Sequence, residues 1–383
     1  MDFARATVVV AVLVGCASCG SSRALTRSTL ATETRPAALE RALAPESDFD
    51  TVLLVSIDGL RSDALIVVAG SLPAFDRIRV GAGTLNARTD PDQTVTLPNH
   101  TGMLTSRLVE GPDGHHWTRN DEVEDGQTIH ARRKEYVASA FDVAHDHGAW
   151  TGLYAGKPKF RVYDHSYGAT HGAEDGIPPD HGRDKIDHYF VDAAPATLTD
   201  ALLEELTRAD SARKRFFFVH FAIPDLVAHA KGWDVTPGSH YMKALADVDA
   251  ALGRILDAIE TSAVLRGNTA IVLTADHGGG APFKSHDQPH MWVDYMIPFC
   301  VWTGHGASAD LYALNATTRV DPSIGRPRPG DGALPPVRNA DAGNLCLDLL
   351  GLPPIPRSSV NAAQELRTVV VPRTDEPATR AGG

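Results

Sequence analysis

The 383-residue chain has only four cysteines and no excess of positive charge. Its formal net charge of −12 argues against sequence-independent nucleic-acid binding, which needs a basic surface. The sequence also lacks an internal repeat and a dinucleotide-binding glycine motif, and Gly278 to Gly280 are not directly followed by the Lys and Ser/Thr that a P-loop needs. With 43% apolar and 22% charged residues the chain is globular, and it is long enough for one large α/β domain or two ordinary ones. An anionic substrate would therefore need local positive charge, such as metal ions.

The N-terminal apolar segment, residues 7–15, follows Arg5 and is too short to span a bilayer, which is typical of the core of a secretory signal peptide. It ends at Cys16 in the order Leu-Val-Gly-Cys, which resembles the lipobox of bacterial lipoproteins, where the peptide is cut before a cysteine that is then lipidated. The alternative is an ordinary signal peptide cut a few residues later. Both interpretations predict export, and the first predicts a lipid anchor at Cys16 in the bacterial cell envelope, on its periplasmic or outer-membrane face.

Cys300 and Cys346 are the cysteines of the segment expected to fold, and each lies in an apolar stretch. We expect both to be buried free thiols. In an exported protein they could instead pair. Neither has neighbours at metal-ligand spacing, so no metal site is expected there.

Apolar segments that suit buried strands alternate with segments of helical periodicity, which predicts an α/β fold. The predicted strands are 51–57, 150–155, 215–222, 268–275 and 296–302. The predicted helices are 72–80, 100–105, 131–147, 197–208, 241–259 and 341–350. The polar segment 110–127 is expected to be a loop, and 165–188, rich in Gly, Pro and His, a loop or a small cap over the site.

Three of the predicted strands end in an acidic residue, namely Asp58, Asp225 and Asp276. In open α/β sheets such strand ends carry the chemistry, although a single Asp there also suits a helix cap. His229, one helical turn after Asp225, would lie on the same helix face, so both could bind one ion. His277 follows Asp276 and precedes a run of glycines, which lets the chain turn so that both side chains face one site.

A hydroxyl and an amide occur in residues 94–100 (Thr-Val-Thr-Leu-Pro-Asn-His), where the proline fixes a turn into a helix. Thr96 is a candidate nucleophile at the start of that helix, where free backbone N–H groups favour a phosphate. Asn99 is a candidate to hold one phosphate oxygen. By itself the segment also fits a plain helix entry.

Lys157 and Lys159 lie just after the predicted strand 150–155. From that position a lysine could reach a bound phosphate, so both are candidate substrate-binding residues. The alternative is a solvated loop.

The acids and histidines at the strand ends are ligand types for metal ions. Catalytic zinc is usually held by three Asp or His ligands, with an open position for substrate. Two ions a few ångströms apart would stabilise the attacking and leaving oxygens of a displacement at phosphorus, and a threonine hydroxyl needs such activation at neutral pH. Sites of this kind also accept manganese or iron. One further histidine, from His286 or His290, would complete the set.

In this order and spacing the residues resemble the alkaline phosphatase superfamily, in particular its type I phosphodiesterase/nucleotide pyrophosphatase branch. The nucleophile motif of that branch, Thr-Phe-Pro-Asn-His, stands here as Thr-Leu-Pro-Asn-His at residues 96–100. Ile57-Asp-Gly59, Asp225 with His229, and Asp276-His-Gly278 extend the match, which covers about residues 50–305. The resemblance implies an α/β three-layer sandwich with a central, mostly parallel sheet and loop or cap insertions.

The resemblance also implies two divalent metal ions, expected to be zinc. The ligands of one ion would be Asp225, His229 and a later histidine. The ligands of the other would be Asp58, Asp276 and His277. Thr96 would be both a ligand and the nucleophile, and Asn99 would bind a non-bridging phosphate oxygen.

The later histidine is where this sequence departs from the branch, in which we would expect it far downstream in a His-Gly context. We assign it to His286, which lies shortly before the Ile-Pro-Phe of the strand 296–302, as in shorter bacterial relatives. His290 and His305, the latter in Gly-His-Gly, are the alternatives.

The implied activity is hydrolysis of a small-molecule phosphodiester or nucleotide pyrophosphate through a phosphothreonine. The same machinery would serve a phosphate monoesterase, which Lys157 and Lys159 favour because a monoester carries an additional negative charge. A sulfatase is not expected, since that branch needs a Cys or Ser convertible to formylglycine in place of Thr96. A non-catalytic binding lipoprotein is a further alternative, against which the complete ligand set argues.

The chain is accordingly divided into a signal peptide (1–15), a flexible tether (16–48), a catalytic domain (49–355) with a cap-like insertion at about 110–190, and a peripheral C-terminal tail (356–383). No motif in the sequence specifies the leaving group or the oligomeric state.

Overall fold

A computed structural model of the chain describes residues 49–67, 69–175, 182–208, 213–304 and 308–368. The predicted signal peptide, the tether and the candidate anchor Cys16 lie outside the described residues. Within those ranges no helix combines the length and the apolar character needed to cross a membrane.

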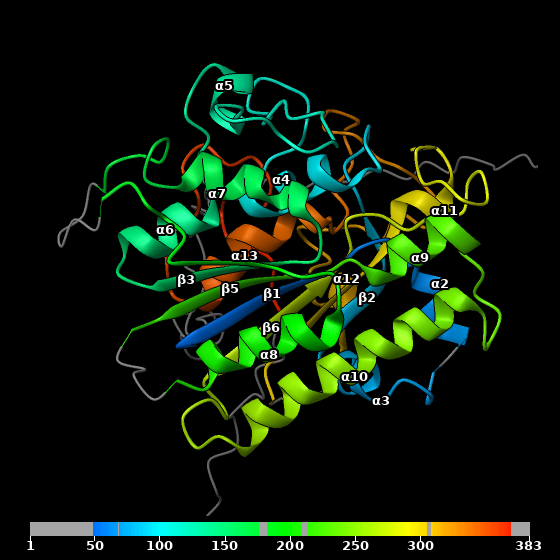
Figure 1. Ribbon diagram of the computed structural model, residues 1–383. Helices are drawn as coiled ribbons and strands as arrows, with labels where there is room; N and C mark the ends of the chain where they lie inside the picture. Colours follow the sequence, from blue (N-terminus) through cyan, green and yellow to red (C-terminus); the bar gives the residue numbers. More distant parts are fainter. Residues whose placement is uncertain (1–48, 68, 176–181, 209–212, 305–307, 369–383) are drawn as a thin grey trace, which may run out of the picture. The chain divides into compact units, whose positions relative to one another are not determined.

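One eight-stranded sheet forms the centre of the described structure, in the order β4-β3-β5-β1-β6-β7-β2-β8 (Figure 1). Its strands are β1 (Thr51–Ile57), β2 (Ala82–Arg88), β3 (Trp150–Ala155), β4 (His188–Val191), β5 (Arg215–Phe221), β6 (Thr269–Thr274), β7 (Met296–Trp302) and β8 (Ala309–Asp310). β1 is parallel to β5 and β6, and β3 is parallel to β4 and β5, whereas β7 is antiparallel to β6 and β2. The predicted central, mostly parallel sheet is confirmed.

Helices cover both faces of the sheet, which gives the predicted three-layer α/β sandwich (Figure 1). One face carries α8 (Pro195–Leu206) and α10 (His240–Thr261), with α3 (Pro73–Arg79) and α9 (Ile223–Lys231) packed against α10. The other face carries α4 (Thr96–Thr105), α6 (Ala140–Asp146), α7 (Arg161–Tyr167) and α13 (Ala342–Leu349). The remaining helices are α2 (Ser62–Val67), α5 (Ile129–Arg133), α11 (Trp292–Tyr295), α12 (Leu311–Leu314) and the 3₁₀ helices η1 (Pro158–Phe160) and η2 (Asn339–Asp341).

β1 occupies the centre of the sheet because it has no polar face to expose. All seven of its residues, Thr-Val-Leu-Leu-Val-Ser-Ile, are buried, and such side chains suit a strand that is covered on both faces. In register, Val55 lies between Val219 of β5 and Leu273 of β6. The parallel register places the carboxyl ends of these three strands, and the residues that follow them, at one edge of the sheet.

The predicted helix 131–147 is wrong as a single element. α5 ends where Lys134 adopts a left-handed conformation with φ of 62°. α6 begins with a separate capping box, in which the Ser139 side chain accepts from the N–H of Asp142. Lysine gives no sequence signal for such a break, since the left-handed region is ordinarily occupied by glycine or asparagine.

Two further expectations differ from the structure. β2, with the sequence Ala-Gly-Thr-Leu-Asn-Ala-Arg, was not predicted, because it has few β-branched residues and owes its conformation to pairing with β7. The range 110–190, expected to be a cap-like insertion, contains β3 and β4, which extend the central sheet. It is therefore not one insertion, although its polar part, 110–127, is a loop as predicted.

Residues 356–368, expected to belong to a peripheral tail, pack against the rest of the described fold. Leu366 is only 1% exposed. The backbone N–H groups of Ser359 and Val360 donate to the Ser106 carbonyl at 3.0 and 2.9 Å. Backbone bonds such as these have no signature in the side-chain sequence, so the polar composition of the segment was misleading.

Cys300 in β7 and Cys346 in α13 are buried and unpaired, as predicted. Burial raises the pKa of the Cys300 thiol to about 12 and that of the Cys346 thiol still further. Both thiols are therefore protonated at neutral pH and unreactive.

Truncation of the central strand should strongly destabilise the fold. Leu54 is 0% exposed, so Leu54→Ala is expected to lower the free energy of unfolding by about 2–5 kcal/mol through lost burial and the cavity left behind. Ile324→Ala, at a residue that is 78% exposed, should change it by less than about 0.5 kcal/mol. Denaturant unfolding followed by circular dichroism measures both, and equal effects would contradict the assigned core.

Candidate functional site

Three acidic residues meet at the carboxyl ends of β5, β1 and β6. Asp58 and Asp276 are 0% exposed and Asp225 is 1% exposed. The backbone N–H of Asp58 donates to the Phe221 carbonyl at 3.0 Å, and that of Gly59 donates to Asp276 Oδ1 at 3.1 Å. The turn after β1 is thus tied to both neighbouring strands, and the three carboxylates share one buried region.

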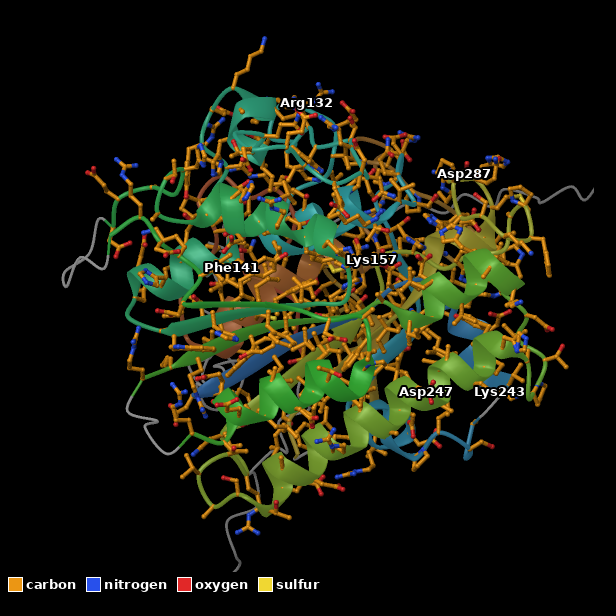
Figure 2. The ribbon with its side chains drawn as sticks, viewed as in Figure 1. Arg132, Phe141, Lys157, Lys243, Asp247 and Asp287 are labelled. Atoms are coloured by element: carbon orange, nitrogen blue, oxygen red, sulfur yellow. The ribbon has the colours of Figure 1, made fainter. Side chains whose placement is uncertain are left out.

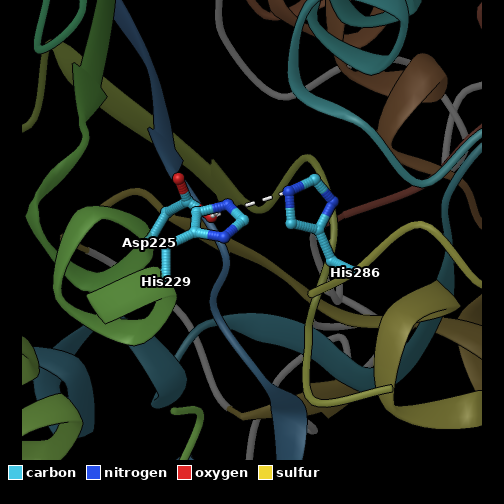
Figure 3. A group of neighbouring side chains, drawn as sticks. All are labelled: Asp225, His229 and His286. Atoms are coloured by element: carbon cyan, nitrogen blue, oxygen red, sulfur yellow. Dashed lines mark ion pairs between the residues drawn. The ribbon is translucent and has the colours of Figure 1, made fainter. Parts of the chain in front are cut away.

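Asp225, His229 and His286 form the first cluster, which is one of three groups of side chains among the described residues that could hold a metal ion (Figure 3). Asp225 and His229 lie one turn apart on α9, and His286 comes from the loop between β6 and α11. The Nε2 atoms of His229 and His286 lie 3.3 and 3.8 Å from Asp225 Oδ1. The His229 side chain is 45% exposed, so this cluster opens to solvent.

Asp58, Asp276 and His277 form the second cluster. His277 Nε2 lies 3.5 Å from Asp58 Oδ1 and 3.1 Å from Asp276 Oδ2. Ligand atoms of Asp58, Asp225 and His277 also lie within 4.8 Å of one another, so the clusters adjoin. The structure therefore brings together all six Asp and His side chains that were predicted as ligands.

Each of the three histidines uses its Nδ1 atom in the same way. Nδ1 of His229 bonds the Lys284 carbonyl at 3.0 Å, and Nδ1 of His277 bonds the Gly278 carbonyl at 2.8 Å. Nδ1 of His286 bonds the carbonyl of Thr94. A carbonyl only accepts, so Nδ1 carries the proton in every case and Nε2 is the atom left for a ligand bond.

Four buried side-chain atoms in the clusters have no hydrogen-bond partner among the described residues. They are Asp58 Oδ1, Asp225 Oδ1, Asp276 Oδ2 and His277 Nε2. Buried polar atoms are nearly always paired, and leaving one unpaired costs about 1–3 kcal/mol. All four are acceptors or can become acceptors, and they converge, so the residues present fit divalent cations.

Lys157, labelled in Figure 2, lies between the two clusters. It is 9% exposed, and its Nζ donates to Asp58 Oδ2 and to Asp225 Oδ2 at 2.6 Å each. The alternative of a solvated loop is therefore excluded for this lysine. Each carboxylate gives one oxygen to Lys157 and keeps its other oxygen toward the clusters.

The site shifts the pKa values of its groups in opposite directions. Burial by itself raises the pKa of the Asp58 carboxyl, but Lys157 and two histidines outweigh it and hold that pKa well below its usual range. Burial lowers the pKa of a histidine, yet Asp276 and Asp58 raise that of His277 to about 9. At His286 burial prevails and lowers the pKa to about 4. A cation bound at His277 must therefore displace a proton at neutral pH.

Helix α4 places Thr96 beside the clusters. Thr94, two residues earlier, donates its hydroxyl to the His286 carbonyl and accepts from His286 Nδ1. His100, one turn later, has its Nδ1 3.6 Å from Asp276 Oδ2. The first turn of α4, which begins at Thr96, thus lies between one residue of each cluster.

The side-chain amide of Asn99 forms four hydrogen bonds, all to protein groups. Its Oδ1 accepts two hydrogen bonds and its Nδ2 donates two. The partners are the N–H of Asp90, Nδ2 of Asn339, and the carbonyls of Gln93 and Val95. In this arrangement the amide of Asn99 braces the loop before α4.

Asn120, which was not singled out in the sequence, lies at the start of α4 instead. Its Oδ1 accepts from the backbone N–H of Leu97 at 3.0 Å and from Lys159 Nζ at 2.9 Å. Leu97 follows Thr96 directly, so these bonds connect Lys159 to the candidate nucleophile. The signal that could have found Asn120 is an amide within a polar loop, which is too common to be specific.

His100 and His220 were also missed. Both are 0% exposed. His100 Nε2 bonds Ser56 Oγ at 2.8 Å and its Nδ1 bonds the Thr96 carbonyl at 2.8 Å, which fastens α4 to β1. His220 interrupts an apolar strand, and that interruption was its only sequence signal.

His290 and His305 were the alternatives to His286 as the later histidine. His290 is exposed and belongs to neither cluster. His305 lies outside the described residues.

The fold is shared with solved structures of the alkaline phosphatase superfamily. A protein of the alkaline phosphatase superfamily from Vibrio parahaemolyticus is 13% identical, with a TM-score of 0.52 and coverage of 84% of this chain and 71% of that one. Murine ectonucleotide pyrophosphatase/phosphodiesterase 5, solved as an inactive variant with AMP, is 16% identical, with a TM-score of 0.52 and coverage of 84% and 100%. The protein BT4656, solved in complex with its substrate D-glucosamine-2-N,6-O-disulfate, is 13% identical, with a TM-score of 0.53 and coverage of 86% of this chain and 82% of that one. Identities this low establish the shared fold alone.

The sequence assigns the family within that class. The profile of the family described as type I phosphodiesterase/nucleotide pyrophosphatase matches residues 52–298, which is more than half of the chain. The chain therefore belongs to this family, whose members are metal-dependent hydrolases of the phosphoester type. Among curated proteins, no sequence gives a significant match.

Removal of one histidine should weaken metal binding at one cluster and leave the other cluster unaffected. His286→Ala takes away one of three ligands from the cluster of Asp225 and His229, so the variant should retain one tightly bound divalent ion and bind the other at least about 10-fold more weakly. Elemental analysis after dialysis against a weak chelator measures both stoichiometries. His290→Ala is the control, since His290 is exposed. Retention of two tight ions by His286→Ala would reject His286 as a ligand.

Proposed function

We propose that this protein is a phosphodiesterase of the nucleotide pyrophosphatase type that uses Thr96 as its nucleophile and two divalent cations, zinc by ligand type. One cation would be held by Asp225, His229 and His286. The other would be held by Asp58, Asp276 and His277. The observation that carries the proposal is the convergence of four buried ligand atoms without hydrogen-bond partners beside the first turn of α4.

The proposed reaction has two displacements at phosphorus. In the first, Thr96 Oγ loses its proton and forms a bond to phosphorus, while the bond to the leaving oxygen breaks and that oxygen takes up a proton. In the second, a water oxygen bonds to the phosphorus of the phosphothreonine, the bond to Thr96 Oγ breaks, and a proton from that water restores the hydroxyl. When bound, the two cations would stabilise charge on the attacking and leaving oxygens.

Residues at the start of α4 would orient the phosphoryl group. The positive end of the helix favours an anion at Thr96. Asn120 is better placed than Asn99 to contact a phosphate oxygen, since its side chain is bonded to the N–H of Leu97, whereas all four hydrogen-bonding positions of the Asn99 amide are used by protein groups. We therefore propose that Asn99 holds the loop in place and that Asn120 contacts the substrate.

Loss of the Thr96 hydroxyl should abolish turnover without loss of metal. Thr96→Ala is expected to lower kcat for bis-p-nitrophenyl phosphate on the order of 10³-fold or more, because the group that forms the covalent bond is gone. Thr96→Ser keeps a hydroxyl and should retain measurable activity. Elemental analysis should find two ions in both variants. Near-normal activity of Thr96→Ala would exclude Thr96 as the nucleophile.

A phosphate monoesterase is the second candidate, because two lysines lie in the site. Lys157 is 9% exposed, and Lys159 donates to both oxygens of Asn120. Burial lowers the pKa of Lys159, with the charge of Lys157 adding to that effect. Positive charge at this position would match the additional negative charge of a monoester.

Comparison of two chromogenic substrates distinguishes these candidates. A phosphodiesterase should turn over bis-p-nitrophenyl phosphate with the higher kcat/KM, and a monoesterase should prefer p-nitrophenyl phosphate. Lys159→Ala should lower the monoester rate about 10-fold or more relative to the diester rate, because it removes charge that only the monoester needs. Lys243→Ala, at an exposed residue of α10 (Figure 2), should change neither. An equal effect of Lys159→Ala on both substrates would remove the support for the second candidate.

The substrate would be a small-molecule phosphoester, and export with a lipid anchor at Cys16 stays a prediction from residues 1–16. A binding lipoprotein without activity would be indicated if the purified protein carried no metal and cleaved no phosphoester. A screen of nucleotide, phospholipid-headgroup and sugar-phosphate esters would identify the leaving group.

A further inference from the structure

A buried histidine lies behind the cluster of Asp58, Asp276 and His277. His220 is the penultimate residue of β5 and is 0% exposed. Its Nδ1 accepts from the backbone N–H of Gly156 at 3.1 Å, and its Nε2 lies 2.9 Å from Asp58 Oδ2. Because Nδ1 is an acceptor, the ring proton is on Nε2, and His220 donates to the Asp58 carboxylate.

This bond fixes which oxygen of Asp58 is available. Oδ2 accepts from both His220 and Lys157. Oδ1 has no hydrogen-bond partner among the described residues and lies 3.5 Å from His277 Nε2. Rotation of the carboxylate would exchange the two oxygens and break both donated bonds, so the pair of donors holds Oδ1 toward the cluster.

The ring of His220 is itself held in place. It stacks on Phe160, with centroids 4.1 Å apart and planes 22° apart. It meets the edge of His100 at 4.9 Å and 86°. His100 bonds the carbonyl of Thr96, the first residue of α4. The two imidazoles therefore pack together next to both α4 and the second cluster.

We propose that His220 is a positioning residue that orients Asp58 for the cation held by Asp58, Asp276 and His277. The proposal rests on the proposed function, in so far as that function needs this cation. Partners that orient a metal-binding carboxylate typically contribute 10–100-fold to metal affinity. The effect of losing His220 should be confined to this cation, because the first cluster, that of Asp225, His229 and His286, has no hydrogen bond to His220 among the described residues.

Two conservative variants test the two hydrogen bonds of His220 one at a time. Asparagine can place an acceptor near the position of Nδ1, so His220→Asn keeps a partner for the N–H of Gly156 but has no donor that reaches Asp58. Glutamine is longer and can place its amide N–H₂ near the position of Nε2, so His220→Gln restores the donor to Asp58. If the role of His220 were merely to fill the core, asparagine, the smaller residue, would lower stability more than glutamine, but neither variant would weaken one metal site selectively.

His130 provides a matched control. Its Nδ1 accepts from the backbone N–H of Val137 at 3.1 Å, and its Nε2 donates to the carbonyl of Ser166 at 2.7 Å. His130→Asn therefore loses the same kind of bond at a position that serves no predicted ligand. Thermal unfolding of the metal-free proteins shows whether each variant is folded.

The experiment is a competition for Zn²⁺ between the protein and a chromophoric chelator. Wild type should bind two ions. His220→Asn should bind one ion as wild type does and the other about 10–100-fold more weakly, and His220→Gln should be within a few fold of wild type. His130→Asn should bind both ions unchanged. The absorption spectrum of the Co²⁺-substituted protein should change in His220→Asn only.

The outcomes distinguish this proposal from the proposed function. If wild type and folded His220→Asn bind two ions with equal affinity, His220 does not position Asp58, and the two-metal hydrolase stands. If His220→Gln is as weak as His220→Asn, the donated bond is not the cause and the proposal is overturned. If wild type itself binds no divalent cation, both the proposed function and this inference fail.

Discussion

Three carboxylates buried at adjacent strand ends repel one another, and the structure depends on the positive charge that offsets this repulsion. Lys157 supplies part of that charge through bonds of 2.6 Å to Asp58 and Asp225. The negative charge of these carboxylates, above all that of Asp276, also raises the pKa of His277 against the effect of burial. A group of acids this deeply buried is costly for stability alone, so its presence points to a ligand of high positive charge.

The surrounding polar groups are arranged to keep that ligand position open. Backbone carbonyls take up Nδ1 of His229, His277 and His286 and leave each Nε2 facing the carboxylates. On the far side, His220 and Lys157 take up the outer oxygen of Asp58. The remaining carboxylate oxygens and Nε2 atoms face one another, where a cation could bind between them. This pre-organisation is what a metal-dependent displacement at phosphorus needs, since a site that must rearrange would lose much of the gain.

Much of the fold and site could be predicted from local sequence. The buried strands β1, β3, β5, β6 and β7 have continuous apolar segments, and they were predicted to within a residue at either end. β2 and the break between α5 and α6 could not be predicted, because pairing with β7 and the left-handed Lys134 leave no mark in local periodicity. In the site, residue types at strand ends identified the acids and histidines that cluster there, whereas Asn120 and His220 have no neighbouring motif that marks them.

The sequence by itself determined the kinds of atoms at the strand ends, the order in which they occur and the family to which the chain belongs, because these follow from residue identity and short spacings. Only the tertiary structure decided which atom of each side chain stays free, that Lys157 lies between two acids, and that Asn120 accepts from the N–H of Leu97 at the first turn of α4 while other protein groups use the amide of Asn99. Those outcomes depend on hydrogen bonds between residues as far apart as Asp58 and His220, which become neighbours only when β1 and β5 pair in register.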